Sequence, residues 1–324
     1  MAISAGTAIL AATIAQRHYV DGESKSDIAD SLGMSRFKVA RLLELSVREG
    51  IIQFQISTPN PFNPRLSEAL RKKFGLRRAV VVDVTEEQTA PTTLRQRLGS
   101  AAASVLSETV TEKDVLGIGW GRTLSAMAGE LTELARCPVV QMGGMAGSVH
   151  ENSLELIRQI SNTGGGTAYP LFVPLLLPDA TTAASLHNQP GVAAAFDLFD
   201  SITVAAVAIG SWSPPDSQMM EAVPEEDRRS LLEKGVCAEV LATLLKEDGP
   251  VVTDLDSRTI ALTVDQLRNI NELIVVAGGL SKTRAIRAVM AAGLGTTLVT
   301  DSIAARELLN LPNATSPIHQ LTAW

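Results

Sequence analysis

Two glycine-rich stretches of the sequence combine residue types that can hold a phosphate group. They read "VLGIGWGRTLSAM" and "LIVVAGGLSKTRAI", and each runs from an apolar segment into a helical pattern. Glycine allows backbone N–H groups to approach an anion at the start of a helix, where the helix dipole favours negative charge. A hydroxyl and a cation beside such a turn complete a phosphate cradle. The residues that could form it are Gly119, Gly121, Arg122, Thr123, Gly278, Gly279 and Lys282.

Both turns place a cation close behind their glycines, and this pairing predicts a phosphorylated ligand. The alternative is that the glycines only make tight strand-to-helix turns. A dinucleotide site is not predicted, because Arg122 stands where the GxGxxG pattern has its third glycine. Asn152 and Glu239 could hydrogen-bond sugar hydroxyls, and an ordinary place on the surface is the alternative for each.

No catalytic constellation is evident in the sequence. The four histidines are scattered along the chain: His18, His150, His187 and His319. No HExxH, GxSxG or metal-ligand cluster appears, so we predict neither a metal nor a cofactor. An enzyme acting on sugar phosphates would need an acid–base pair near the cradle, and Glu239 or Asp254 with His150 is the one pairing available.

Short apolar runs alternate with helical patterns from Ala79 onward. The runs are uninterrupted, as expected of strands buried on both faces of a sheet. They occupy residues 79–83, 114–119, 138–144, 202–210, 272–279 and 296–301. This rhythm predicts an α/β domain with a doubly wound, mostly parallel sheet. Ligands of such sheets bind at the carboxyl ends of the strands, where both glycine turns are expected.

The stretch "SKSDIADSLGMSRFKVARLL", residues 24–43, has the spacing of a helix-turn-helix motif. Ala29 is small where two helices must approach closely, and Gly33 suits the left-handed position of the turn. Val39 and Leu42 fall where the motif needs apolar core residues. These four positions predict two helices joined by a tight turn.

The second of these helices carries the side chains that could contact DNA. Ser35 can cap its N-terminus, and the basic residues Arg36, Lys38 and Arg41 would reach the major groove. The alternative is an ordinary helical hairpin with a solvated basic face. Because the four spaced positions coincide with basic residues in the right segment, we predict a DNA-binding domain.

The residues after this motif predict a wing and then a domain junction. "REGIIQFQIS" ends the helix at Gly50 and alternates like a strand over 51–56. "TPNPFNP" reads as a linker, and "PRLSEALRKKFGL" predicts a helix whose basic residues either contact phosphates or form a solvated face. We divide the chain into an all-α, winged helix-turn-helix domain at 1–57, a linker and junction helix at 58–78, and an effector-binding and oligomerisation domain at 79–324.

Charge is divided unevenly along the 324 residues. Residues 1–57 carry equal numbers of basic and acidic side chains, residues 58–78 carry +5, and the net charge of −7 leaves −12 for the rest. An acidic protein with a neutral-to-basic end fits contact with a polyanion at that end. Cys137 and Cys237 lack CxxC spacing, which predicts buried thiols in a reducing compartment. The sequence shows neither a membrane-spanning run nor a signal peptide, so we expect a cytoplasmic protein.

The order of these segments resembles the SorC-type family of bacterial sugar-responsive transcription regulators. The resemblance covers nearly the whole chain and rests on "DIADSLGMSRFKVARLLELSVREGIIQFQI", "LGIGWGRTLSAMAGEL", "VCAEVLATLLKEDG" and "VVAGGLSKTRAIRAVMAAGLGTTLVTD". It implies a helix-turn-helix joined to an effector domain related in fold to sugar-phosphate isomerases, assembled as a homotetramer. It also implies that both glycine turns bind the effector's phosphate and that Asn152 and Glu239 face its sugar. Family members often carry a basic residue where this chain has Met142, which leaves open a second charged anchor and a bisphosphate effector.

The sequence thus predicts a transcriptional regulator that binds a palindromic operator in double-stranded DNA, responds to a small phosphorylated sugar and governs a carbohydrate catabolism operon. A sugar-phosphate isomerase or deaminase with an accessory N-terminal domain is the alternative from another class. A binding module for an apolar ligand or a protein is a third, and it would leave both glycine–cation turns without a role.

Overall fold

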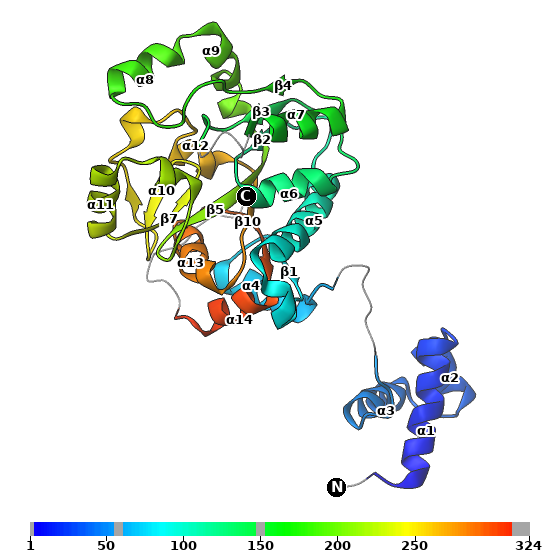
Figure 1. Ribbon diagram of the computed structural model, residues 1–324. Coiled ribbons are helices and arrows are strands. Elements are labelled where there is room, and N and C mark those ends of the chain that lie inside the picture. The colour runs from blue at the N-terminus through cyan, green and yellow to red at the C-terminus, as the bar shows by residue number, and fades with distance from the viewer. Residues whose placement is uncertain (1–2, 55–60, 147–152, 313–324) are drawn as a thin grey trace. The chain divides into compact units, whose positions relative to one another are not determined.

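The chain divides into two units, Met1–Pro59 and Asn60–Trp324. The computed structural model describes residues 3–54, 61–146 and 153–312 (Figure 1). Within these ranges, no helix is both long enough and apolar enough to cross a membrane.

Residues 3–54 contain three α-helices: α1 (Ala5–Ala15), which continues into a π-helical turn (Gln16–Val20), α2 (Lys25–Ser31) and α3 (Arg36–Arg48). Serine hydroxyls fix where α2 and α3 begin, because each satisfies a backbone N–H of the first helical turn. Ser24 accepts a hydrogen bond from the N–H of Asp27, and Ser35 accepts one from that of Lys38 at 3.3 Å. Between the two helices Gly33 has a φ of 61°, a left-handed conformation that glycine adopts without steric cost.

A small hydrophobic core holds these helices together. All three contribute buried side chains: Ala11, Ile14, Ala15, Ile28, Ala29, Val39, Leu42 and Leu43. The core includes Ala29, Val39 and Leu42, the apolar positions that the spacing of the motif predicts. The pair of helices joined by a glycine turn therefore lies where the sequence places it.

The chain beyond α3 does not form the predicted strand in the residues that the structure describes. Residues 51–54 lie outside any strand, and residues 55–60 are outside the described part of the chain. The N–H of Ile52 donates to the carbonyl of Ser46 at 3.0 Å, and Ile51 and Ile52 both pack against the helical core. The prediction from alternation is wrong over 51–54, because two consecutive isoleucines cover the same core.

The second unit is built on a parallel sheet in the order β1–β11–β10–β5–β2–β3–β4. Its strands are β1 (Arg78–Val82), β2 (Leu116–Ile118), β3 (Val139–Gln141), β4 (Ala168–Tyr169), β5 (Val204–Trp212), β10 (Glu272–Val276) and β11 (Thr297–Asp301). Each predicted apolar run contains most or all of one of these strands, and the mostly parallel α/β fold is confirmed. The two-residue β4 was not predicted.

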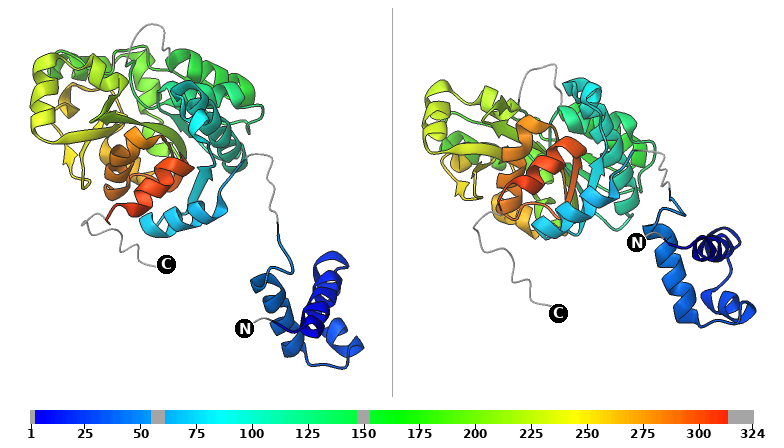
Figure 2. Two further views of the ribbon diagram at one scale, coloured as in Figure 1. Left: turned by 60° about the horizontal axis from the view of Figure 1, so that its bottom comes forward. Right: turned by 90° about the horizontal axis from the view of Figure 1, so that it is seen from below.

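Helices cover both faces of this sheet (Figures 1 and 2). Successive residues of one strand divide between two cores, because Val81 belongs to one while Val80 and Val82 belong to the other. The core of Val80 includes α5 (Pro91–Thr109), α6 (Arg122–Glu130) and α7 (Ser153–Gly164). The core of Val81 includes α4 (Pro64–Phe74), α8 (Ala180–His187), α9 (Pro190–Phe196), α10 (Gln218–Ala222), α11 (Glu225–Glu233), α12 (Val264–Asn269), α13 (Thr283–Ala291) and α14 (Ser302–Asn310).

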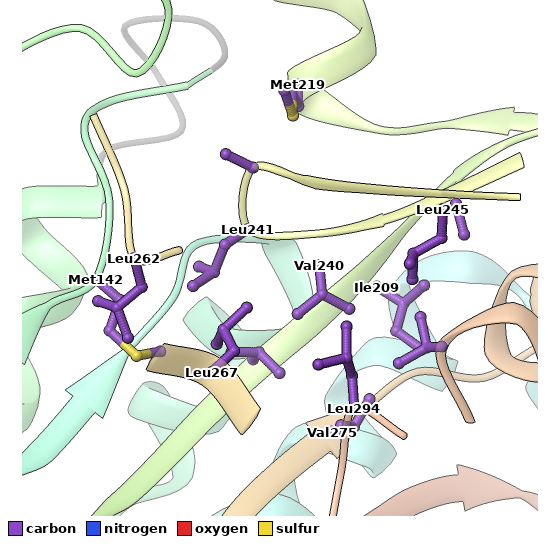
Figure 3. Packing of buried hydrophobic residues seen from close by; sticks show 14 of the residues in the cluster. Met142, Ile209, Met219, Val240, Leu241, Leu245, Leu262, Leu267, Val275 and Leu294 are labelled. Atoms are coloured by element: carbon purple, nitrogen blue, oxygen red, sulfur yellow. The ribbon is translucent and has the colours of Figure 1, made fainter. Parts of the chain in front are cut away.

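An antiparallel branch extends from the far end of β5. This strand pairs in parallel with β2 and β10 and, further along, antiparallel with β7. The branch consists of β6 (Pro215–Asp216), β7 (Val236–Val240), β8 (Thr243–Lys246) and β9 (Val251–Val252). Figure 3 shows its side chains Val240 and Leu241 in one hydrophobic cluster with Ile209 of β5 and Val275 of β10. The branch, which was not predicted, places Glu239 beside β5.

The helix predicted at the domain junction packs within the second unit. Leu70 of α4 is fully buried against the sheet, and the N–H of Asn63 donates to the carbonyl of Val81 at 2.8 Å. Its basic side chains also have partners in this unit: Lys73 donates to the carbonyl of Leu309 at 3.2 Å. For Lys73 the structure favours a role in the fold over contact with phosphates.

Candidate functional site

Both glycine turns lie at the same edge of the sheet. β2 and β10 flank β5, and their carboxyl ends lead into α6 and into the 3-10 turn that precedes α13. Since the three strands are parallel, their carboxyl ends meet at one edge, where α/β proteins bind ligands. Five residues predicted to bind the effector line one cavity there, which we call the inner cavity: Gly121, Arg122, Thr123, Glu239 and Lys282.

A larger outer cavity, of about 620 Å³, adjoins the inner one. Gly278 and Gly279, the remaining predicted turn residues apart from Gly119, line this outer cavity. Four residues line both cavities: Arg95, Thr123, Asp216 and Lys282. Arg95 and Asp216 were not predicted, and the structure adds them to the site.

Two of the predicted glycines use their N–H groups within the fold. The N–H of Gly119 donates to the carbonyl of Ala206 at 2.9 Å, and Gly119 does not line either cavity. The N–H of Gly279 donates to a carboxylate oxygen of the buried Asp301 at 2.5 Å. In this conformation neither N–H is available to an anion. Gly121, by contrast, begins α6 without a side-chain cap, and the first turn of that helix lines the inner cavity.

Three basic side chains surround Asp216, and we call them the cation cluster: Arg95, Arg122 and Lys282. The Nζ of Lys282 lies 3.2 Å from Oδ2 of Asp216, and Arg122 donates to Oδ1. The guanidinium of Arg95 lies 4.0 Å from the same Oδ1. Burial raises the pKa of Asp216, but the charges of Lys282, Arg122 and Arg95 outweigh it and hold the pKa below its usual value. Asp216 is therefore ionised at neutral pH.

Glu239 is a buried carboxylate whose two oxygens are already hydrogen-bonded. The hydroxyl of Ser217 donates to Oε1 at 2.6 Å, and the indole N–H of Trp212 donates to Oε2. Only 4% of Glu239 is exposed. Burial raises its pKa, the hydrogen bonds from Ser217 and Trp212 lower it, and the result is a pKa of about 7.

Glycine at position 210 makes room for this carboxylate. A Cβ at Gly210 would lie 1.6 Å from Oε1 of Glu239, far inside van der Waals contact. Ala238, Glu239 and Val240 pair with β5 around this point, so the carboxylate lies directly against the strand. A glycine in the middle of a strand often marks such a close approach.

A family model described as "Putative sugar-binding domain" matches residues 60–310. The chain is 30% identical to the erythritol catabolism regulatory protein EryD of Brucella abortus, over 94% of this chain and 97% of that protein. It is also 30% identical to the transcriptional regulator LsrR of Escherichia coli O139:H28, over 92% and 93% of the two chains. The chain belongs to the SorC-type family of sugar-binding regulators. The full-length sorbitol operon regulator SorC from Klebsiella pneumoniae has the same fold, with a TM-score of 0.71, 23% identity and coverage of 93% of this chain and 98% of that one.

Met142, the departure from the SorC-type pattern, does not face either cavity. Its side chain is fully buried and packs beside Leu262 (Figure 3). A Cβ added at Gly117 would lie 2.5 Å from the sulfur of Met142, which shows how closely this side chain fits. In this conformation the position supplies core packing and no anchor for a second phosphate.

Of the other residues predicted for a site, Asp254 is the one that can be compared with the cavities. Asn152 and His150 lie outside the described residues. Asp254 forms an ion pair with Lys234 and lines neither cavity, so Glu239 is the one of the two carboxylates proposed as a partner of His150 that lies at the site. Among the residues that the structure describes, no group of His, Cys, Asp and Glu is arranged to hold a metal ion.

The predicted DNA-contacting residues lie on one exposed part of the N-terminal unit. Ser35, Arg36, Lys38 and Arg41 are all exposed, whereas Val39 between them is fully buried in the core of that unit. None of the three basic residues forms an ion pair with another residue of the described ranges. Val39 is therefore a core residue and the predicted DNA-contacting residues face solvent, as the sequence predicts.

The residues that were missed are those whose role depends on distant partners. Arg95 comes from α5, which carries no glycine turn, and nothing in its neighbourhood marks it. Asp216 and Ser217 follow the apolar β5 in "SWSPPDSQ", and polar residues directly after a buried strand were a usable signal. Trp212 could not have been linked to Glu239 without the β5–β7 pairing.

The raised pKa of Glu239 predicts a pH-dependent contribution to stability. Between its usual pKa of 4.5 and the folded value of about 7, the folded protein keeps a proton that the unfolded chain has lost. The free energy of unfolding should therefore fall as pH rises through this range and level off above it. Glu239→Gln cannot titrate, so the stability of the wild type minus that of the variant should decline from about pH 5 to about pH 7 in denaturant unfolding. A difference that stays constant with pH would contradict this assignment.

Proposed function

We propose that this chain is a DNA-binding transcriptional regulator that responds to a small phosphorylated sugar and governs a carbohydrate catabolism operon. The observation that carries the proposal is the presence of two cations, Arg122 and Lys282, and the buried Glu239 in one cavity at the strand ends. Cations and the start of a helix bind phosphate oxygens, and a carboxylate accepts hydrogen bonds from sugar hydroxyls. A ligand that carries both groups matches this combination.

The second unit would be related in fold to sugar-phosphate isomerases. Gly121 and Thr123 would bind the phosphate beside the cations, with Gly278 and Gly279 shaping the outer side. Asn152 would face the sugar together with Glu239.

For the N-terminal unit we propose a helix-turn-helix that lays α3 in the major groove. Arg36, Lys38 and Arg41 would contact base edges and phosphates, and Ser35 would help to fix the start of the helix. Residues 1–57 have no net charge, so one copy makes few phosphate contacts. Specific binding then needs several copies side by side, which fits a homotetramer on a palindromic operator.

Regulation would follow from a shift in the population of two conformations. An effector that binds better when the strand-end loops are closed stabilises the closed form by its difference in affinity. Closure would change the packing between subunits and with it the spacing of the recognition helices. The names of the relatives EryD and LsrR, a catabolism regulatory protein and a transcriptional regulator, support this assignment.

The test is a thermal-shift screen of the purified full-length chain with matched pairs of sugars, each as the phosphate and as the free sugar. A bound phosphate at a hundredfold excess over its Kd should stabilise the protein by about 2.7 kcal/mol and raise the Tm by several degrees. The free sugar of the same pair should shift the Tm little. A shift from free sugars alone would contradict the phosphate part of the proposal.

One observation favours the alternative function, a sugar-phosphate isomerase or deaminase. A pKa of about 7 suits Glu239 to general acid–base chemistry, and sugar-phosphate isomerisation needs such a group. Turnover of a pentose or hexose phosphate by the purified protein would establish that activity, and its loss in Glu239→Gln would assign it to this carboxylate.

A further inference from the structure

The cation cluster is filled by a carboxylate of the chain itself. Arg122 and Lys282 both contact the carboxylate of Asp216, and Lys282 also donates to its backbone carbonyl at 3.4 Å. Phosphate would need these same donors. Asp216 therefore occupies, in this conformation, the place that the proposed function gives to the phosphate of the effector.

The next residue along the chain occupies the other half of the site. The hydroxyl of Ser217 donates to Oε1 of Glu239, the oxygen that a sugar hydroxyl would otherwise use. Neighbouring residues thus present a carboxylate to the cations and a hydroxyl to the buried acid. A phosphorylated sugar would also bring an anionic group and a hydroxyl.

We propose that residues 213–218, which we call the strap, act as a built-in ligand that the effector must displace. The proposal rests on the proposed function, because it assigns the cation cluster and Glu239 to the effector. Asp216 stands in for the phosphate and Ser217 for a sugar hydroxyl. An effector that brings only one of these groups replaces half of what the strap supplies.

A sugar phosphate could reach Glu239 in the inner cavity only after such a displacement. The inner cavity has a volume of about 40 Å³, room for a few water molecules and too little for a sugar phosphate. Asp216 lines both cavities, so it forms part of the wall between the inner cavity and the outer one of about 620 Å³. Moving Asp216 away would join the two and open the cation cluster.

The strap pairs with one strand, β5, and the hydroxyl of Ser211 in that strand also donates to the carbonyl of Pro214 at 2.6 Å. β6 is two residues long and pairs with the end of β5 alone, through Ser211 with Asp216 and Trp212 with Pro215. The Asp216 side chain is 30% exposed and that of Arg122 is 35% exposed, so water weakens their ion pair. A phosphate carries up to twice the charge of a carboxylate and has three acceptor oxygens, which lets it compete for the same donors.

Displacement of the strap would also carry the signal away from the cavity. Ser217 caps α10 by accepting a hydrogen bond from the N–H of Met220 at 2.8 Å. Ser217, which contacts Glu239, is therefore also the residue that caps the N-terminus of α10. Loss of this cap would disturb the first turn of α10 when the effector binds.

The test measures binding of inorganic phosphate to the full-length protein by calorimetry, in wild type and in Asp216→Asn. Removing the competing charge should tighten phosphate binding by about tenfold, because one like charge no longer lies beside the anion. The matched control is Asp265→Asn, which removes one charge from an 85%-exposed side chain outside both cavities and should leave phosphate affinity unchanged. Ser217→Ala should leave phosphate affinity near that of wild type and strengthen binding of a sugar phosphate.

Unchanged or weaker phosphate binding in Asp216→Asn would overturn the strap. The double variant Asp216→Asn with Lys282→Ala separates this failure from that of the proposed function. If phosphate binds the double variant as tightly as Asp216→Asn, the cation cluster is not the phosphate site and the proposed function fails. If Asp216→Asn is destabilised without phosphate, we expect phosphate to raise the Tm of this variant more than it raises the Tm of wild type. An equal or smaller rise in the variant would count against the strap.

Discussion

Replacing Lys282 by alanine is expected to weaken binding of the phosphorylated effector by about 2–3 kcal/mol, a factor of roughly 30–150. The side chain is 17% exposed, and its Nζ lies 2.7 Å from the carbonyl of Ile209 and 3.2 Å from Asp216. It is therefore oriented before the ligand arrives. A charge-assisted hydrogen bond from a fixed, mostly buried donor contributes more than one from a mobile surface lysine.

The measurement is the Tm of wild type and Lys282→Ala against increasing sugar phosphate, with calorimetry to give the Kd. Lys234→Ala is the matched control, because Lys234 pairs with an aspartate in the same unit but lines neither cavity. It should bind as wild type does. DNA binding without effector should survive in both variants. An effector response in Lys282→Ala as strong as in wild type would show that the cradle is placed wrongly.

Replacing Arg36 or Arg41 by alanine is expected to reduce operator affinity by about 1–3 kcal/mol for each arginine that contacts a base. Both side chains are exposed on α3, on either side of the buried Val39. The substitution is present in every copy of the assembly, so it weakens binding to both half-sites of a palindromic operator at once. Because α3 belongs to a separate unit, the effector-dependent rise in Tm should stay intact.

A duplex selected by the full-length protein from a random pool supplies the probe, titrated at two salt concentrations. Arg48→Ala is the matched control on the same helix, because Arg48 lies in its last turn and pairs with Glu49. It should change affinity little. If both Arg36→Ala and Arg41→Ala bind the selected duplex as wild type does, α3 is not the recognition helix.

The sequence determined the elements whose causes are local. Ser24 and Ser35 mark the starts of two helices because a hydroxyl can cap only the helix that directly follows it. The six apolar runs became parallel strands because a strand covered on both faces has no polar side. The sequence could predict that Arg122 and Lys282 share one site, because each follows glycines at the end of such a strand. The parallel topology brings these strand ends together. The family could be recognised because four segments of the sequence resemble it in the same order along the chain.

Only the tertiary structure decided which groups in the site are free. The N–H of Gly279 is taken by Asp301, and both oxygens of Glu239 are taken by Ser217 and Trp212. These partners come from other strands and loops, and no spacing in the sequence brings them within reach. The strand predicted from alternating residues was wrong over 51–54 for a similar reason, because Ile51 and Ile52 both pack against the helical core. The fold could be predicted from periodic burial, whereas the occupancy of the site depends on hydrogen bonds and ion pairs between residues far apart in the chain.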